Sequence, residues 1–298
     1  MKPVFQHNVI ISFAMWFEWF LLSKGEAFSN RTSTLYPQED DRLDPNLLSY
    51  ASPFKQWVTD SSINNVVIPN EITNTDTLDT MQRGENGLII DYQEGRIFLP
   101  NIPSNENLNL EGSFSLKDFN IYLTDQTEED IIVENKYDIN ERFKDNANPK
   151  PVTPYDQLIP AIFISDGRTY NKPFSFGGQD ETCVDIRCVI FAEKLYFLDG
   201  VLSLFRDSQF TCFPFLNYED HPLNEYGDIK DAPSISNPTG SGYNYLELAT
   251  ARKTGSDFYI QNCVASKMKE SVSNNTTKNL FIGFLDFEVT KVRTPRSG

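Results

Sequence analysis

The chain has 298 residues, 39% of them hydrophobic and 13% aromatic, which is enough to fill the core of one large domain or of two ordinary ones. Its 42 acidic and 26 basic side chains give a formal net charge of -16, so the molecule as a whole repels nucleic acids and anionic membranes. This composition argues against a disordered chain and against a generic DNA-binding protein. An acidic lining would nevertheless keep DNA from adhering to the wall of a passage.

The N-terminal segment, residues 1–28, predicts a helix that packs on the core. Apolar residues recur there in two adjacent stripes at helical spacing, Val9, Phe13, Trp16 and Phe20 in the first and Ile10, Phe17 and Leu21 in the second. Lys24 then falls in the last turn and Gly25 at the stop. This apolar face is wider than one packing contact requires, so we expect burial on two sides, within the subunit or against another copy.

A cleaved signal peptide is the alternative for the same segment. Lys2 precedes the apolar run, and Asn30, Asn274 and Asn275 each begin an Asn-x-Thr triplet. Glu18, however, lies inside the run, which is too short to span a bilayer and is followed by no small-residue cleavage pattern. We therefore expect a retained helix.

Residues 29–86 are polar and interrupted by proline, as in NRTSTLYPQEDDRLDPN and PNEITNTDTLDTMQRGENG. Loops of this length are uncommon in compact domains unless they reach a partner. We expect an extended, loop-rich insert, in which LLSYASPFKQWVTDSSI docks on the core.

Residues 87–290 are expected to form the core domain. GLIIDYQEGRIFL predicts a hairpin with Leu88, Ile90 and Tyr92 on one face and Gly95 in a left-handed turn. EGSFSLKDFNIYL predicts another strand. Thr124 or Asp125 is then expected to cap a helix in QTEEDIIVENK.

The segment CVDIRCVIFAEKLYFLDGVLSLFRD changes its period near Ala192. Residues that alternate as in a strand are followed by residues at helical spacing: Val184, Ile186, Cys188 and Ile190, then Leu195, Leu198, Leu202 and Phe205. A proline-rich connector, NANPKPVTPYDQLIP, leads into the strand AIFISD before it. GYNYLELAT, DFYIQNCVASKM and NLFIGFLDFEVT predict three strands after it, and residues 291–298 are expected as a basic tail.

Together these elements predict an α+β fold with about seven strands and three helices. We expect a mixed, mainly antiparallel β-sheet flanked by the N-terminal helix and a second amphipathic helix, with long loops between the elements.

The sequence offers little material for catalysis. The four cysteines, Cys183, Cys188, Cys212 and Cys263, match no standard zinc spacing and are expected as buried free thiols. His7 and His221 are the two histidines, and no nucleophile motif stands near either one. Glu219 and Asp220 are expected to raise the pKa of His221. We expect that the chain is not an enzyme and that it binds no cofactor or metal. A zinc-dependent enzyme that uses cysteine and His221 is an alternative interpretation.

The order of elements resembles the tail-terminator and neck-protein group of tailed bacteriophages. The resemblance lies in VIISFAMWFEWFLLSKGEAF, GLIIDYQEGRIFL, SFSLKDFNIYL and CVDIRCVIFAEKLYFLDGVLSLFRD, and NLFIGFLDFEV is similar to virion proteins of large contractile-tailed phages. It implies a non-enzymatic ring component at the head-tail junction, assembled in the host cytoplasm and located in the virion. The implied partners are copies of the chain, connector and tail proteins, and DNA only as passing cargo, with no membrane.

A ring subunit buries apolar helix faces against its neighbours. The expected interface residues are Phe13, Trp16, Phe17, Phe20, Phe197, Val201, Leu204, Arg293 and Arg296. The rival interpretation is a secreted, β-rich protein that binds or hydrolyses carbohydrate, with Phe213, Phe215 and Tyr218 as exposed aromatics and two of the many acids as catalysts.

Overall fold

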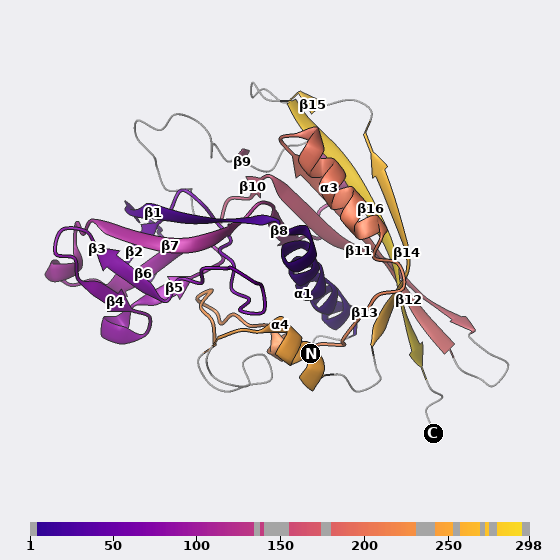
Figure 1. The fold of residues 1–298 in the computed structure, drawn as a ribbon, viewed down its shortest axis with the longest axis horizontal. Helices are drawn as coiled ribbons and strands as arrows, with labels where there is room; N and C mark the ends of the chain where they lie inside the picture. Colours follow the sequence, from indigo (N-terminus) through magenta and orange to yellow (C-terminus); the bar gives the residue numbers. More distant parts are fainter. Residues whose placement is uncertain are drawn as a thin grey trace.

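The computed structural model describes residues 5–133, 138–139, 155–173, 180–230, 242–252, 257–268, 272–273 and 279–293. These residues form two large β-sheets and a short parallel strand pair, and a long N-terminal helix lies between the two large sheets (Figure 1). The predicted α+β class, mixed and mainly antiparallel, is confirmed. The strands divide into two large sheets, however, where the sequence suggested one.

The N-terminal helix, α1 (Phe5–Gly25), confirms the prediction from apolar periodicity. Ser12 accepts a hydrogen bond from the backbone N–H of Leu216 at 2.8 Å, which ties the middle of the helix to a distant loop. Its side chains contact both sheets, so most of the circumference is buried. Burial on two sides therefore takes place within the chain.

The first sheet has the strand order β4-β3-β7-β1-β2-β6-β5. Its strands are β1 (Phe28–Gln38), β2 (Leu47–Ala51), β3 (Glu71–Asn74), β4 (Thr80–Gln82), β5 (Ile89–Asp91), β6 (Arg96–Pro100) and β7 (Leu110–Lys117). Two short 3₁₀ turns, Glu85–Gly87 and Pro103–Asn105, lie between them.

Residues 29–86, expected as an extended, loop-rich insert, contribute four strands to the first sheet, so this segment is part of a sheet and its loops connect those strands. β1 pairs with β7 from Phe28 opposite Lys117 to Leu35 opposite Leu110. Its side chains are mostly polar and half-exposed, so the apolar alternation that marks a strand is weak. Pairing with a strand some 80 residues away holds this segment in place, and local sequence carries no signal of it.

The second sheet has the order β13-β14-β16-β12-β11-β8, with β15 also pairing with β16. Its strands are β8 (Asn120–Leu123), β11 (Ala161–Pro173), β12 (Asp180–Ala192), β13 (Cys212–Phe213), β14 (Phe258–Lys267), β15 (Val272–Ser273) and β16 (Asn279–Arg293). A separate parallel pair joins β9 (Asp138–Ile139) to β10 (Leu158–Ile159).

The segment predicted as one strand, EGSFSLKDFNIYL, is two strands in different sheets. β7 ends at Lys117 in the first sheet, and β8 begins at Asn120 in the second, where it runs parallel to β11. The two residues between them turn the chain from one sheet to the other. Residues 291–293, expected as part of a basic tail, belong to β16 instead, where Arg293 pairs with Asp180.

The remaining helices are α2 (Glu128–Ile132), α3 (Leu195–Arg206) and α4 (Tyr245–Ala251), with a 3₁₀ turn at Tyr218–Asp220. The strand-to-helix change near Ala192 is confirmed by β12 and α3. The cap of α2 is Thr127 and not Thr124 or Asp125. GYNYLELAT, predicted as a strand, contains α4 instead, because Asn244 caps it through the N–H of Glu247.

The predicted hairpin is confirmed as β5 and β6. Leu88, Ile90 and Tyr92 are all buried on one face. Gly95 has a φ of 67°, and a Cβ there would lie 1.9 Å from the carbonyl oxygen of Phe54. Glycine is therefore required both by the turn and by the close approach of a neighbouring loop.

Candidate functional site

The residues expected at a subunit interface mostly lie inside the chain. Phe13, Trp16 and Phe17 are buried, and so is Val201 of α3, which corrects their assignment to an intersubunit surface. Phe20 and Leu204 are half-buried and pack against the same core. The side chain of Arg293, and Arg296 as a whole, lie outside the described residues.

These residues are buried because α1 packs against other elements of the same chain on both sides. The Phe17 ring stacks on Phe205 of α3, with 3.9 Å between ring centroids and an angle of 4° between the ring planes. Phe13 lies edge-on to Phe287 of β16 at 5.0 Å. Residues 11, 14, 15, 18 and 19 face the loops of the first sheet. The wide apolar face therefore serves an interior helix.

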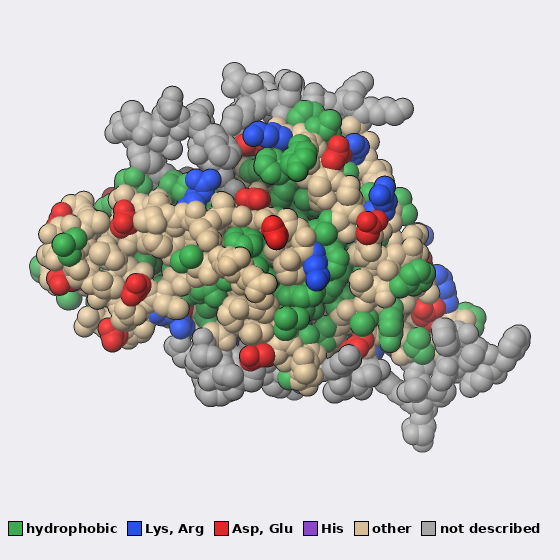
Figure 2. Space-filling model, viewed as in Figure 1, with side chains coloured by type: hydrophobic (Ala, Val, Ile, Leu, Met, Phe, Trp, Pro, Cys, Tyr) green, Lys and Arg blue, Asp and Glu red, His purple; other side chains and the backbone are tan. Residues whose placement is uncertain are grey.

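Exposed apolar side chains remain on the first turn of α3. Leu195 is 45% exposed, Tyr196 83% and Phe197 43%, and the Tyr196 and Phe197 rings contact each other edge-on at 5.9 Å. We call these three residues the α3 apolar turn. Figure 2 shows hydrophobic side chains gathered over α3 on this face. Among the predicted interface residues whose side chains the structure describes, Phe197 alone is exposed.

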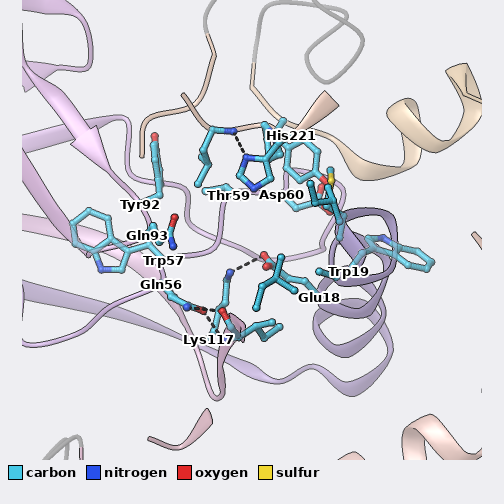
Figure 3. Close-up of a pocket in the computed structure, with 18 of the residues that line it drawn as sticks. Glu18, Trp19, Gln56, Trp57, Thr59, Asp60, Tyr92, Gln93, Lys117 and His221 are labelled. Atoms are coloured by element: carbon cyan, nitrogen blue, oxygen red, sulfur yellow. Dashed lines mark hydrogen bonds and ion pairs between the residues drawn. The ribbon is translucent and has the colours of Figure 1, made fainter. Parts of the chain in front are cut away.

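A cavity of about 270 Å³ lies between α1 and the loops of the first sheet (Figure 3). One face of α1 forms one wall, and aromatic side chains of several elements form much of the rest. Its aromatic residues are Trp19, Trp57, Tyr92, Tyr122 and Tyr243. Leu123 and Gln93 are exposed and lie at its outer rim. The cavity is near the lower end of the size range for small-molecule pockets.

Two of the polar side chains in this cavity form an ion pair. Lys117 Nζ lies 2.8 Å from Glu18 Oε1, and Figure 3 shows the two side chains pointing toward each other. The side-chain amide of Gln56 donates a hydrogen bond to the carbonyl oxygen of Ile121 and accepts one from its N–H, which joins the loop to β8. These groups have partners, so they shape the cavity without leaving an uncompensated charge.

His221 lies on the opposite side of the cavity. Its Nδ1 accepts a hydrogen bond from the N–H of Leu223 at 3.4 Å, so the neutral ring carries its proton on Nε2. Burial lowers the pKa of His221, with Lys230 and Lys117 acting in the same direction. The expectation that Glu219 and Asp220 raise this pKa is therefore wrong, because the carboxylate of Asp220 is paired with Arg252 at 2.6 Å.

Asp60 is the one acid of the cavity that is deeply buried, with 2% of its surface exposed. Its Oδ1 accepts hydrogen bonds from the N–H groups of Ser62 and Tyr245. The Ser62 side chain also hydrogen-bonds to this carboxylate. Burial raises the pKa of Asp60 to about 6, against the opposing effect of these hydrogen bonds.

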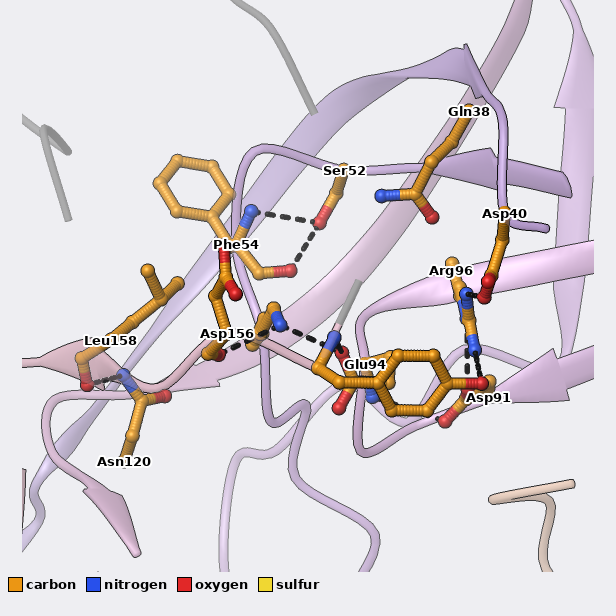
Figure 4. A network of polar contacts seen from close by, with 12 residues as sticks. Gln38, Asp40, Ser52, Phe54, Asp91, Glu94, Arg96, Asn120, Asp156 and Leu158 are labelled. Atoms are coloured by element: carbon orange, nitrogen blue, oxygen red, sulfur yellow. Dashed lines mark hydrogen bonds and ion pairs between the residues drawn. The ribbon is translucent and has the colours of Figure 1, made fainter. Parts of the chain in front are cut away.

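A second polar cluster lies where the β5–β6 hairpin meets the segment that enters the second sheet (Figure 4). The Arg96 guanidinium contacts Asp40 at 2.8 Å, Asp91 at 3.0 Å and the Tyr155 hydroxyl at 3.1 Å. Lys55 Nζ contacts Glu94 at 2.7 Å. These charged groups have partners and bridge chain segments, so the cluster has the character of a structural link.

The four cysteines form no disulfide. Cys183, Cys188 and Cys263 are buried free thiols, whereas Cys212 is exposed, which differs from the expected burial of all four. Burial raises the pKa of Cys263 to about 12. The described residues contain no group of three or more His, Cys, Asp or Glu side chains that could hold a metal ion.

Sequence reasoning missed the cavity because its walls come from segments as distant as residues 11 and 243. One signal was present: Glu18 interrupts an otherwise apolar run. A charge on the buried side of a helix requires a partner, and Lys117 supplies it.

No protein-family model matches the chain, and no curated protein or solved structure was found to be similar to it. Within the part of the chain that the structure describes, no helix has the length and apolar character needed to cross a membrane.

Proposed function

We propose that this chain is a structural subunit that assembles with copies of itself, as a non-enzymatic ring component at the head-tail junction of a tailed bacteriophage. The observation that carries the proposal is the α3 apolar turn, where Leu195, Tyr196 and Phe197 remain exposed next to a closed core. Contiguous apolar groups on a soluble protein mark sites of association, and aromatic residues are enriched in such interfaces.

The resemblance in element order supplies the finer part of the proposal, which is the place in a virion. The net charge of -16 is consistent with a wall along which DNA passes without adhering. The helix α1 lies at the centre of the core, so removal of residues up to 25 would uncover the inner faces of both sheets. The proposal therefore uses a chain that retains this helix, unlike the secreted alternative.

The experiment compares two exposed tyrosines. Tyr196→Glu places a charge on the α3 apolar turn, and Tyr218→Glu places the same charge at an exposed position, 60% accessible, on a different element. Size-exclusion chromatography with light scattering is expected to show an oligomer for the unmodified chain and for Tyr218→Glu. For Tyr196→Glu it is expected to show a monomer with unchanged circular dichroism.

Mass spectrometry and negative-stain images of purified particles test the location. The chain is expected among the virion proteins, and rings are expected from the purified protein. A chain that stays monomeric at high concentration refutes the assembly, and one that is absent from particles refutes the virion assignment.

A further inference from the structure

The outer edge of β14 is open over much of its length. The neighbouring strand on that side, β13, pairs only with the first two residues of β14. Phe210 and Thr211, which precede β13, exchange hydrogen bonds with Ile260. No other described strand borders this side of β14, so residues 262–267 form an unpaired edge of the second sheet (Figure 1).

The backbone groups of three residues point away from the sheet at this edge. Met268 donates its N–H to the carbonyl oxygen of Ile282 on β16 at 3.0 Å. Because the hydrogen-bonding direction alternates along a strand, every second residue before Met268 also faces β16, and the residues between them face outward. The outward residues are Cys263, Ala265 and Lys267, whose N–H and C=O groups on this side have no hydrogen-bond partner among the described residues. An extended chain placed alongside can pair with all three.

This edge lacks most of the protection that proteins give to an exposed strand. Residues 262–267 contain no proline, and their one charge, on Lys267, is drawn onto α3 by an ion pair with Asp199 at 2.6 Å. A bulge at Gln261, whose carbonyl oxygen accepts a hydrogen bond from the Gln209 side chain at 3.0 Å, protects only the beginning of the stretch. The remainder is free to pair with another chain.

The other borders of the two large sheets are better protected. Opposite β14, the second sheet ends in β8, of four residues, and in the uncovered part of β11, which has a bulge between Asp166 and Thr169 and ends at Pro173. The first sheet ends in β4 and β5, of three residues each. Short strands, bulges and proline all hinder pairing at an edge. Among these described borders, β14 of another copy therefore offers the best match to β14.

We propose that two copies of the chain join their second sheets at this edge, with β14 antiparallel to β14 of the other copy about a two-fold axis at Ala265. In this register Cys263 lies opposite Lys267 of the other copy, so each outward residue exchanges hydrogen bonds with a partner. Val264, which is 50% exposed, comes to lie beside Ser266 of the other copy. A two-fold contact uses the same surface on both molecules, so it needs no second site.

The charges at this edge allow two acidic molecules to meet. The chain carries a net charge of -16, but residues 262–267 include no acid, and the nearby Asp199 is neutralised by Lys267. The register places no like charges directly opposite each other, which would oppose pairing. Tyr196 lies one helical turn before Asp199, so the α3 apolar turn stands at one end of the same edge. The inference rests on the proposed self-association, names a contact within it and requires an even number of copies.

Hydrogen exchange resolved to single amides tests the pairing on the unmodified full-length chain. Exchange in the concentrated oligomer is compared with exchange in protein diluted until light scattering shows a monomer. The outward amides of Cys263, Ala265 and Lys267 are expected to exchange at least about tenfold more slowly in the oligomer, because pairing protects them. The amides of Val264 and Ser266 face β16, so they are expected to be protected in both samples and serve as internal controls.

The outcomes separate this contact from the assembly as a whole. An oligomer in which the three outward amides exchange as fast as in the monomer overturns this inference and leaves the proposed self-association intact. An oligomer with an odd number of copies does the same. A chain that stays monomeric at high concentration overturns both.

A pair of variants at the axis provides a second test. Ala265→Pro removes the outward N–H and leaves the hydrogen bonds to β16 in place, as proline at a strand edge does. It is expected to weaken the dimer at least about tenfold, measured by sedimentation, because both copies lose a hydrogen bond at the axis. The control Ala265→Ser keeps the N–H and is expected to pair normally. Unchanged affinity in a folded Ala265→Pro overturns the proposal, and if this variant does not fold, hydrogen exchange in the unmodified chain decides.

Discussion

The helices α1 and α3 have similar apolar character and very different surroundings. α1 lies between two sheets, so Phe13 and Phe17 are buried by neighbours on opposite sides. α3 packs on one sheet and on α1, and the side chains of its first turn, Leu195 to Phe197, remain exposed. Apolar residues on a helix thus indicate that one of its faces is buried. Whether the same chain or a partner buries that face depends on the sheets and helices packed around it.

The largest expected effect separates the two helices directly. Phe17→Ala removes a ring stacked on Phe205 and is expected to lower the free energy of unfolding by about 3–5 kcal/mol. Phe197→Ala, on the α3 apolar turn, is expected to change it by less than about 0.5 kcal/mol. Urea unfolding of dilute protein measures both values. Equal losses in the two variants would contradict the comparison.

The second prediction concerns the polar side of α1, where Asp60 faces the cavity. Burial raises the pKa of Asp60 from 3.8 to about 6 in the folded protein, so the folded state binds more protons than the unfolded state between these values. The contribution of Asp60 to stability is therefore full below about pH 4 and is lost as the pH rises to about 6, a change of about 3 kcal/mol.

Urea unfolding at pH 4 and pH 7 checks this value. As the pH rises from 4 to 7, the free energy of unfolding of the unmodified chain is expected to fall relative to that of Asp60→Asn. The reason is that the amide of the variant has no charge to bury. Asp91, whose pKa burial likewise raises to about 6, is present in both proteins and cancels in the difference. A difference that does not vary with pH would refute the raised pKa.

The third prediction compares the inner and outer sides of α3 through two glycines. A Cβ on Gly283 of β16 would lie 2.6 Å from Cδ1 of Leu198 in α3. Gly283→Ala therefore overpacks the interface at a cost of about 1–3 kcal/mol, partly offset by about 0.5–1 kcal/mol from the loss of glycine flexibility. We expect a net destabilisation of about 1 kcal/mol, measured by urea unfolding.

The outer side of α3 gives the smallest effect and the opposite sign. A Cβ on Gly200 meets no atom within 4 Å. Gly200→Ala is expected to stabilise the protein by about 0.5–1 kcal/mol, because alanine favours the helix. A higher midpoint of thermal unfolding checks this gain. A loss of stability would indicate that the outer side of α3 is covered in the folded chain.

Local periodicity predicted the elements whose pattern is complete within a short segment. These are α1, the β5–β6 hairpin with Gly95, and the change from β12 to α3 near Ala192. It failed at β1, whose polar residues are held by pairing with β7, and at α4, where Asn244 caps a helix too short for periodicity to identify. The cavity was missed because Glu18, Asp60 and Lys117 come from separate segments.

The sequence by itself determined the α+β class, the acidic surface and the presence of two apolar helices, since composition and short-range spacing encode these properties. The tertiary structure alone decided that the strands form two sheets and that α1 is enclosed between them. It also decided that Asp60 is buried. Burial and charge pairing depend on which distant segments meet, and only the folded chain fixes those contacts.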